Sequence, residues 1–184
     1  PGAVILASKD GKIFLHEAVG YHTYSKKREM RKSDLFDLAS ISKVVSTTSA
    51  VMKLYDQGLI DLEVPVVDYL PMFVGKQEKY YSHKKKITIG HLLSHTSGLP
   101  PFKNYSFIQG NMEVVLDSIY NTAPSHILAD TTIYSDIGMI ILGKVIESIS
   151  GLSLGEFSRQ NIFKPLGMNT TMYNPPQEKL HRVV

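Results

Sequence analysis

Ser40 and Lys43 stand three residues apart at the start of a helical pattern, and these residue types can form a nucleophile and its base. Residues three apart share one face of a helix, so the lysine amine can reach the serine hydroxyl. A lysine withdrawn from water has a lowered pKa and can accept the serine proton. The ordinary alternative is a capping serine beside a lysine whose charged end reaches solvent. The pattern alone leaves both interpretations open.

The element that must position this pair is an amphipathic helix predicted over residues 36–58. Its apolar side repeats at three- and four-residue spacing, which predicts a buried face that also carries Ser40 and Lys43. A serine at a helix start lies beside free backbone N–H groups and the positive end of the helix dipole, which favour an oxyanion. Gly58 is the expected stop. The residues of the predicted buried face are Ile41, Val44, Val45, Thr48, Val51, Met52 and Tyr55.

Two weaker patterns are set aside. Ser82 and Lys85 repeat the same spacing, but they fall in a polar stretch predicted to be a loop, and the basic run 84–86 is predicted to be solvated. His91 and His95 lie four apart on a predicted short helix, the spacing of a metal pair. Because no acidic third ligand follows at helical spacing, we predict no metal.

The remaining pattern predicts a hairpin followed by helices. Strands are expected at 3–8 and 12–20 around Asp10-Gly11. The stretches 59–71 and 76–86 look irregular. Short helices are expected after Thr88, across 111–121 and 134–150, and after Ser153, which forms a capping box with Glu156. Two strands alone are marginally stable, so the fold class is α+β with further strands expected beyond Val184.

Composition excludes several classes. Twenty basic and seventeen acidic residues give a net charge of only +3, which does not indicate nucleic-acid binding. There are no cysteines, so disulfides and thiol catalysis are excluded. No apolar run reaches the roughly 18 residues needed to cross a bilayer, and no signal peptide is recognisable. The chain lacks an initiator Met, which suits an excerpt of a longer polypeptide.

Four ordered stretches carry a resemblance to a known family: LFDLASISKVVSTTSAVMKLYDQGLIDL, ITIGHLLSHTSGLP, YSDIGMIILGKVIESISG and FKPLGMNTTMY. In order and spacing the chain resembles the serine β-lactamase and penicillin-binding-protein superfamily, closest to its class C-like branch. The resemblance implies that Ser40 is the acyl-accepting nucleophile, that Lys43 is its lysine, and that Tyr134 is the proton-shuttling tyrosine. It makes His95 part of a structural turn.

Asp136 departs from the family pattern, because it stands where the family usually has asparagine in Tyr-x-Asn. Asparagine can donate its amide to a substrate carbonyl, whereas an ionised aspartate only accepts. Our hypothesis is that Asp136, at this substrate-binding position, pairs with Lys43 and raises its pKa. Tyr134 would then take more of the base role, and efficient β-lactam hydrolysis would be impaired.

The resemblance implies a β-lactamase/transpeptidase-like fold, an antiparallel sheet flanked by helices plus a helical lobe. Residues 1–20 would supply a hairpin of the sheet, and 38–184 the nucleophile helix and helical lobe. The family's third motif, Lys or His followed by x-Gly on a strand, is absent; Lys9-Asp10-Gly11 matches only loosely and lies in a turn. We therefore expect residues 1–184 alone to be inactive.

The implied activity is a serine hydrolase of carboxypeptidase, β-lactamase or esterase type, without a cofactor. Implied substrates are D-amino-acid and peptidoglycan peptides, β-lactams or small esters. The alternative is a non-catalytic penicillin- or peptidoglycan-binding module of the same fold. Such domains act mostly outside the cytoplasm, and some are fused to a glycosidase domain.

Overall fold

The computed structural model describes residues 1–105 and 107–184. The chain forms two compact units. One comprises Pro1–Ala39 together with Thr170–Val184, and the other comprises Ser40–Asn169. The candidate residues Ser40, Lys43, Tyr134 and Asp136 all belong to the second unit, so a single compact unit holds them.

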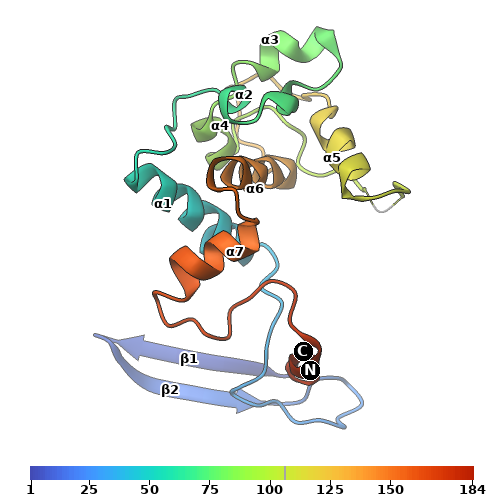
Figure 1. The fold of residues 1–184 in the computed structure, drawn as a ribbon. Coiled ribbons are helices and arrows are strands. Elements are labelled where there is room, and N and C mark those ends of the chain that lie inside the picture. The colour runs from blue at the N-terminus through green and yellow to red at the C-terminus, as the bar shows by residue number, and fades with distance from the viewer. Residues whose placement is uncertain (106) are drawn as a thin grey trace. The chain divides into compact units, whose positions relative to one another are not determined.

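The first unit contains a β-hairpin. Strands β1 (Ala3–Lys9) and β2 (Lys12–Val19) pair antiparallel, from Ala3 opposite Val19 to Lys9 opposite Lys12 (Figure 1). Asp10 and Gly11 have φ angles of 51° and 74°, as a two-residue turn of type I′ requires. The predicted strands and turn are therefore confirmed. The hairpin is the one sheet in the described part of the chain.

A buried carboxylate organises the segment that follows the hairpin. Asp34 lies 2.8 Å from His22 Nε2, accepts 3.1 Å from Arg28 Nη2, and accepts the Arg31 backbone N–H at 2.7 Å. Burial alone would raise the pKa of Asp34, but these hydrogen bonds and positive charges outweigh it and lower the pKa. Beside it, Leu35 donates its N–H to the Arg182 carbonyl at 2.8 Å, which ties the 3₁₀ segment Gln177–Arg182 to this unit.

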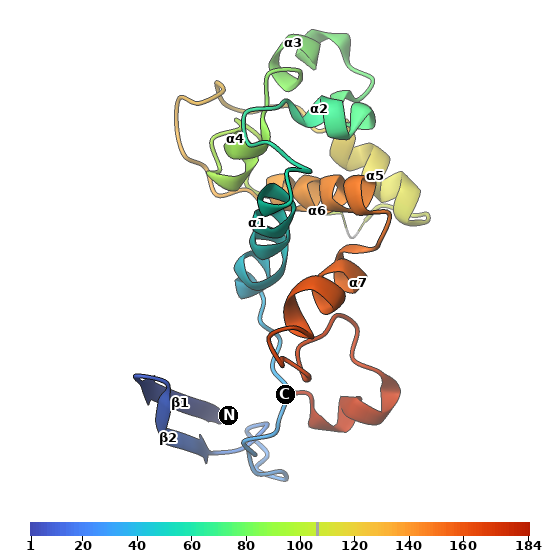
Figure 2. The same ribbon diagram turned by 60° about the vertical axis from the view of Figure 1, so that its left-hand side comes forward.

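The second unit is helical, and its longest helix, α6 (Asp136–Ser150), lies in the middle of it in both views (Figures 1 and 2). The core is apolar, with Phe73, Ile87, Leu92, Ile137 and Leu142 fully buried in it. The other elements are η1 (Lys43–Thr48), α1 (Ser49–Asp56), α2 (Val66–Tyr69), η2 (Pro71–Val74), η3 (Glu78–Tyr80), α3 (Tyr81–Lys84), α4 (Ile89–Leu93), α5 (Met112–Tyr120), α7 (Leu154–Ser158) and η4 (Arg159–Phe163).

Local capping signals place several helix ends where the sequence predicts them. Thr88 caps α4 in a reciprocal capping box with His91, and Ser153 does the same for α7 with Glu156. Helix α6 ends at Gly151, whose φ of 70° is left-handed, the usual conformation of a terminating glycine. The first turns of the short helices α4 and α7 are therefore stabilised by local hydrogen bonds, in addition to the packing of their buried side chains.

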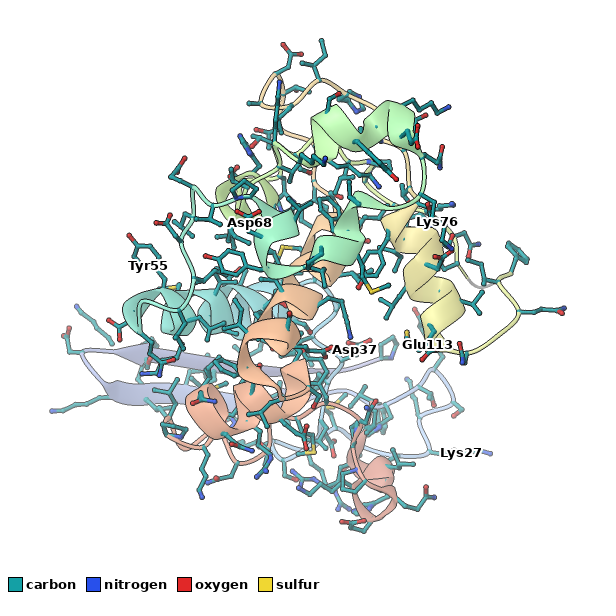
Figure 3. The ribbon with its side chains drawn as sticks, turned by 45° about the horizontal axis from the view of Figure 1, so that its top comes forward. Lys27, Asp37, Tyr55, Asp68, Lys76 and Glu113 are labelled. Carbon is teal, nitrogen blue, oxygen red and sulfur yellow. The ribbon has the colours of Figure 1, made fainter. Side chains whose placement is uncertain are left out.

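The helix predicted over residues 36–58 differs from its prediction. It begins at Ile41 rather than residue 36, and residues 43–48 are π-helical. The buried positions are Ser46, Thr47, Ala50, Val51 and Leu54, whereas Ile41, Val44, Met52 and Tyr55 are exposed. Figure 3 shows the Tyr55 side chain extending away from the helix. Each π-type i→i+5 bond adds a residue to the turn, so the 3.6-residue pattern loses its phase there.

The stretches predicted to be irregular also contain helices. Short helical segments occupy 66–74 and 78–84. Lys84, predicted to be solvated, is only 1% exposed. Its ammonium donates to the Tyr120 carbonyl and lies 5.4 Å from the centroid of the Phe73 ring. Burial lowers the pKa of Lys84 to about 8. The prediction was wrong because tertiary contacts, not local polarity, decide where this lysine goes.

Among the described residues, no single helix is long and apolar enough to cross a bilayer. Helix α6 and the segment Leu154–Phe163 meet the criterion only as a pair, bent by 74° at their junction.

Candidate active site

Ser40 and Lys43 meet at the first turn of the nucleophile helix. The Lys43 backbone N–H donates to the Ser40 carbonyl at 3.1 Å, and the Lys43 ammonium donates to Ser40 Oγ at 3.0 Å. The lysine side chain is 19% exposed, whereas Ser40 is exposed. The predicted contact is therefore present, but the prediction that Ser40 faces the core is wrong. Ser40 precedes the first helical residue, Ile41, so it does not share the buried face of the helix.

Asp136 completes an ion pair with the same lysine. Its Oδ1 lies 2.7 Å from Lys43 Nζ, which confirms the predicted pairing. This oxygen is buried and accepts no hydrogen bond of ordinary geometry from the described residues, so the lysine charge is what offsets its burial. The side chain is nevertheless 42% exposed. One carboxylate oxygen therefore faces the lysine while the remainder of the group reaches solvent.

Tyr134 lies close to Lys43, on the segment that leads into α6. The Lys43 ammonium is 5.0 Å from the centroid of its ring. The tyrosine is 50% exposed, which does not fit a packed core residue. All four residues predicted to form a site are thus gathered around one ammonium group.

The electrostatics of this cluster favour a charged lysine and an acidic phenol. Burial by itself lowers the pKa of Lys43, but its close contacts with Asp136 and Tyr134 and the charge of Asp136 outweigh burial and raise the pKa. The Lys43 ammonium, followed by the Ser40 hydroxyl, lowers the pKa of Tyr134. Lys43 is therefore an ammonium at neutral pH, and the phenolate of Tyr134 is easier to form than that of a free tyrosine.

His95 lies next to the site, although the family resemblance predicts for it only a place in a structural turn. His91 and His95 were predicted to share a helix, but α4 ends at Leu93, before His95. His91 Nδ1 accepts the Thr88 N–H at 3.1 Å, whereas the His95 ring stands 4.7 Å from that of Tyr134, centroid to centroid. The metal spacing is therefore not realised. No group of three or more metal-ligand side chains occurs among residues 1–105 and 107–184.

Comparison with known proteins assigns the family. The family model described as Beta-lactamase matches residues 1–184, the whole chain. The protein belongs to the beta-lactamase family, as the resemblance in its sequence predicts. The predicted β-lactamase/transpeptidase-like fold is also confirmed. The crystal structure of a class C beta lactamase from Rhodobacter sphaeroides superimposes with a TM-score of 0.81 at 24% identity, covering 100% of this chain and 49% of that one.

Two curated relatives come from Bacillus subtilis (strain 168). An N-acetylmuramyl-L-alanine amidase is 32% identical over 195 residues, covering 97% of this chain and 44% of the relative. Penicillin-binding protein 4* is 34% identical over 180 residues, covering 92% of this chain and 38% of the relative. The chain thus spans less than half the length of either protein.

Proposed function

We propose that this chain carries the acyl-accepting half of a serine hydrolase site, with Ser40 as nucleophile. The observation that carries the proposal is the 3.0 Å hydrogen bond from the Lys43 ammonium to Ser40 Oγ at an exposed helix start. That bond engages a lone pair of the hydroxyl and leaves its proton free for a base. The base that the cluster offers is the phenolate of Tyr134, which forms more easily because the pKa of this tyrosine is lowered.

The reaction would proceed in two steps, acylation of Ser40 and hydrolysis of the acyl-enzyme. Tyr134 phenolate accepts the Ser40 proton while Oγ bonds to the acyl carbon and the carbonyl π electrons move onto oxygen. The intermediate collapses, the bond to the leaving group breaks, and Tyr134 returns the proton to the departing nitrogen or oxygen. Water then attacks the acyl-enzyme in the same way, which releases a carboxylic acid and restores Ser40. The Ser40 N–H, at the start of the helix, is one expected oxyanion donor.

Lys43 has an electrostatic part in this scheme. Because its pKa is raised, it remains an ammonium through both steps. Its charge stabilises the Tyr134 phenolate, and its N–H holds Ser40 Oγ in place. Asp136 keeps the lysine charged, and as an acceptor at a substrate-binding position it disfavours substrates whose carbonyl needs a donor there.

The substrate class rests on the relatives. Their names point to bacterial cell-wall chemistry, so we propose peptidoglycan peptides or related D-amino-acid amides and esters as substrates, in a compartment outside the cytoplasm. Slow turnover of β-lactams is expected, because Asp136 replaces a hydrogen-bond donor.

Covalent labelling of the full-length protein tests the proposal. A fluorophosphonate probe or penicillin should leave an adduct on the peptide that contains Ser40, detected by mass spectrometry. Ser40→Ala should remove the adduct, whereas Ser82→Ala, which alters the second serine-lysine spacing of the chain, should not. Absence of any adduct on Ser40 would refute the enzyme and favour a non-catalytic module that binds cell-wall fragments.

A further inference from the structure

We propose that His95 is a positioning residue for Tyr134, acting through hydrogen bonds that hold the backbone on both sides of that tyrosine. The proposal rests on the assignment of Tyr134 as the base. It assigns to the histidine a task in proton transfer without any contact with substrate.

Two hydrogen bonds join His95 to the residues on either side of Tyr134. The Ile133 N–H donates to the His95 carbonyl at 2.9 Å, and the Ser135 N–H donates to His95 Nδ1 at 3.1 Å. The two residues that flank Tyr134 are thus both tied to His95. Its ring also stands 4.7 Å from the Tyr134 ring, tilted by 46°. One residue therefore fixes the backbone of Tyr134 before and after it and contacts its ring.

The backbone of His95 suits this task. Its φ of 58° is left-handed, a conformation that few residues other than glycine, asparagine, aspartate and histidine adopt readily. It lies two residues after the end of α4, and the Thr96 N–H that follows donates back to the His91 carbonyl at 2.9 Å. This reversal presents the carbonyl and the ring of His95 to the same segment. Asparagine is consequently the substitute that best preserves both the conformation and a side-chain acceptor.

The segment that His95 holds is rigid on its far side as well. Ser135 is fully buried, donates its hydroxyl to the Pro100 carbonyl at 2.8 Å and accepts the Gly138 N–H at 3.1 Å. The Asp136 N–H donates to the Pro101 carbonyl at 2.8 Å. Tyr134 is therefore an exposed side chain on a backbone segment that is hydrogen-bonded on both sides. Loss of the Nδ1 bond would leave the Ser135 N–H, directly after Tyr134, without its acceptor and would remove the hydrogen bond between the His95 side chain and this segment.

The protonation state of His95 follows from the geometry. A backbone N–H can only donate, so Nδ1 must be unprotonated, and the ring is neutral with its proton on Nε2. The charged and titratable groups around it are Lys43 of η1, Asp136 of α6 and Tyr134. Burial, followed by the Lys43 charge, lowers the pKa of His95, and Asp136 opposes this only in part. The acceptor is thus present at neutral pH.

Two substitutions separate the acceptor from the rest of the side chain. His95→Asn keeps an acceptor near Nδ1, and His95→Gly removes it; both tolerate the left-handed backbone, and both lose the ring. In the full-length protein we expect the rate of Ser40 labelling by a fluorophosphonate to stay within about threefold of the original for the asparagine variant. For glycine we expect a fall of about tenfold or more, with the pH midpoint of labelling moved upward because Tyr134 is no longer held beside Lys43.

A cycle with Tyr134→Phe shows whether the effect passes through the tyrosine. With phenylalanine at 134, the glycine and asparagine variants should label at equal rates, because the base is already gone. A persistent difference there, or equal rates with Tyr134 intact, would overturn the proposal. If the glycine variant unfolds, shown by its melting curve, the pH midpoint of the asparagine variant decides: it must match the original. Absence of labelling in the unmodified protein would instead refute the hydrolase itself.

Discussion

Lys43 Nζ and Asp136 Oδ1 lie 2.7 Å apart. The family's Tyr-x-Asn pattern usually has a neutral asparagine at the position of Asp136. Because the carboxylate raises the pKa of Lys43 and also opposes ionisation of Tyr134, its removal should lower both values. Asp136→Asn should therefore shift the acid limb of Ser40 labelling to lower pH. A pH series with the fluorophosphonate probe measures the shift.

Asp117→Asn is the matched control for that experiment. Asp117 belongs to α5, and its Oδ1 lies 2.6 Å from the Lys76 ammonium, so the substitution removes the carboxylate of another close ion pair that is not part of the site. Its labelling profile should coincide with that of the original protein. An unchanged midpoint for Asp136→Asn would mean that the pair does not govern the base.

Replacement of Tyr134 by phenylalanine removes the proposed base and keeps the ring. The labelling rate should fall by about 100-fold or more, as is typical when a general base is lost. Thermal unfolding should hardly change, because the tyrosine is half exposed. Tyr55→Phe, which alters an exposed tyrosine on α1, should leave the rate unchanged. If the labelling rate of Tyr134→Phe stays within about threefold of that of the original protein, Tyr134 is not the base, and Lys43 becomes the candidate for that role.

The buried Lys84 predicts a pH-dependent stability. Its pKa in the folded state is about 8, below the 10.5 of a free lysine, so between these values the unfolded chain binds more protons. The free energy of unfolding of the original protein should therefore rise between about pH 8 and pH 10.5. Measured against the free energy of unfolding of Lys84→Met, the rise should be about 1–3 kcal/mol. Urea unfolding across this range measures the difference.

Lys85→Met provides the comparison, since Lys85 is the exposed neighbour in the sequence. Over the same pH range, the unfolding free energy of the original protein should change more relative to Lys84→Met than relative to Lys85→Met, because Lys84 is buried and Lys85 is exposed. Equal changes for the two variants would contradict a special role of the buried lysine.

Gly98 should tolerate no side chain. Its φ is 73°, and a Cβ there would collide with the His126 carbonyl oxygen. Gly151 has a similar φ of 70°, but no described atom lies within 4 Å of a Cβ built there. Gly151→Ala should therefore cost about 1 kcal/mol from backbone strain alone. Gly98→Ala should cost at least about 1 kcal/mol more because of the collision. Equal losses in urea unfolding would contradict the collision.

Features governed by neighbouring residues were predictable from the sequence. The turn at Asp10-Gly11 and the capping boxes of Thr88 and Ser153 depend on contacts within a few positions. The Lys43–Asp136 pair, although distant in sequence, was predictable because the family resemblance brings both motifs into one site.

Features governed by distant packing were not predictable. The π-helical turn carries Ser46, whose hydroxyl lies 2.7 Å from that of Ser158, more than a hundred residues away. The burial of Lys84 depends on Tyr120 and Phe73. The ring contact of His95 depends on a chain reversal after α4 that helical periodicity does not signal. In each case the decisive partner is absent from the local sequence.

The π-helical turn over Lys43–Thr48 also sets a rotational offset between the two ends of one helix. An α-helix advances about 100° per residue, so the extra residue that a π turn absorbs turns Ser40 and Lys43 relative to Ala50, Val51 and Leu54. Deleting one residue within this turn could restore regular α-helical bonding and leave the core contacts of α1 intact. It would swing the serine away from Tyr134. The turn is therefore a place where a single-codon deletion would change the orientation of the proposed nucleophile relative to its proposed base.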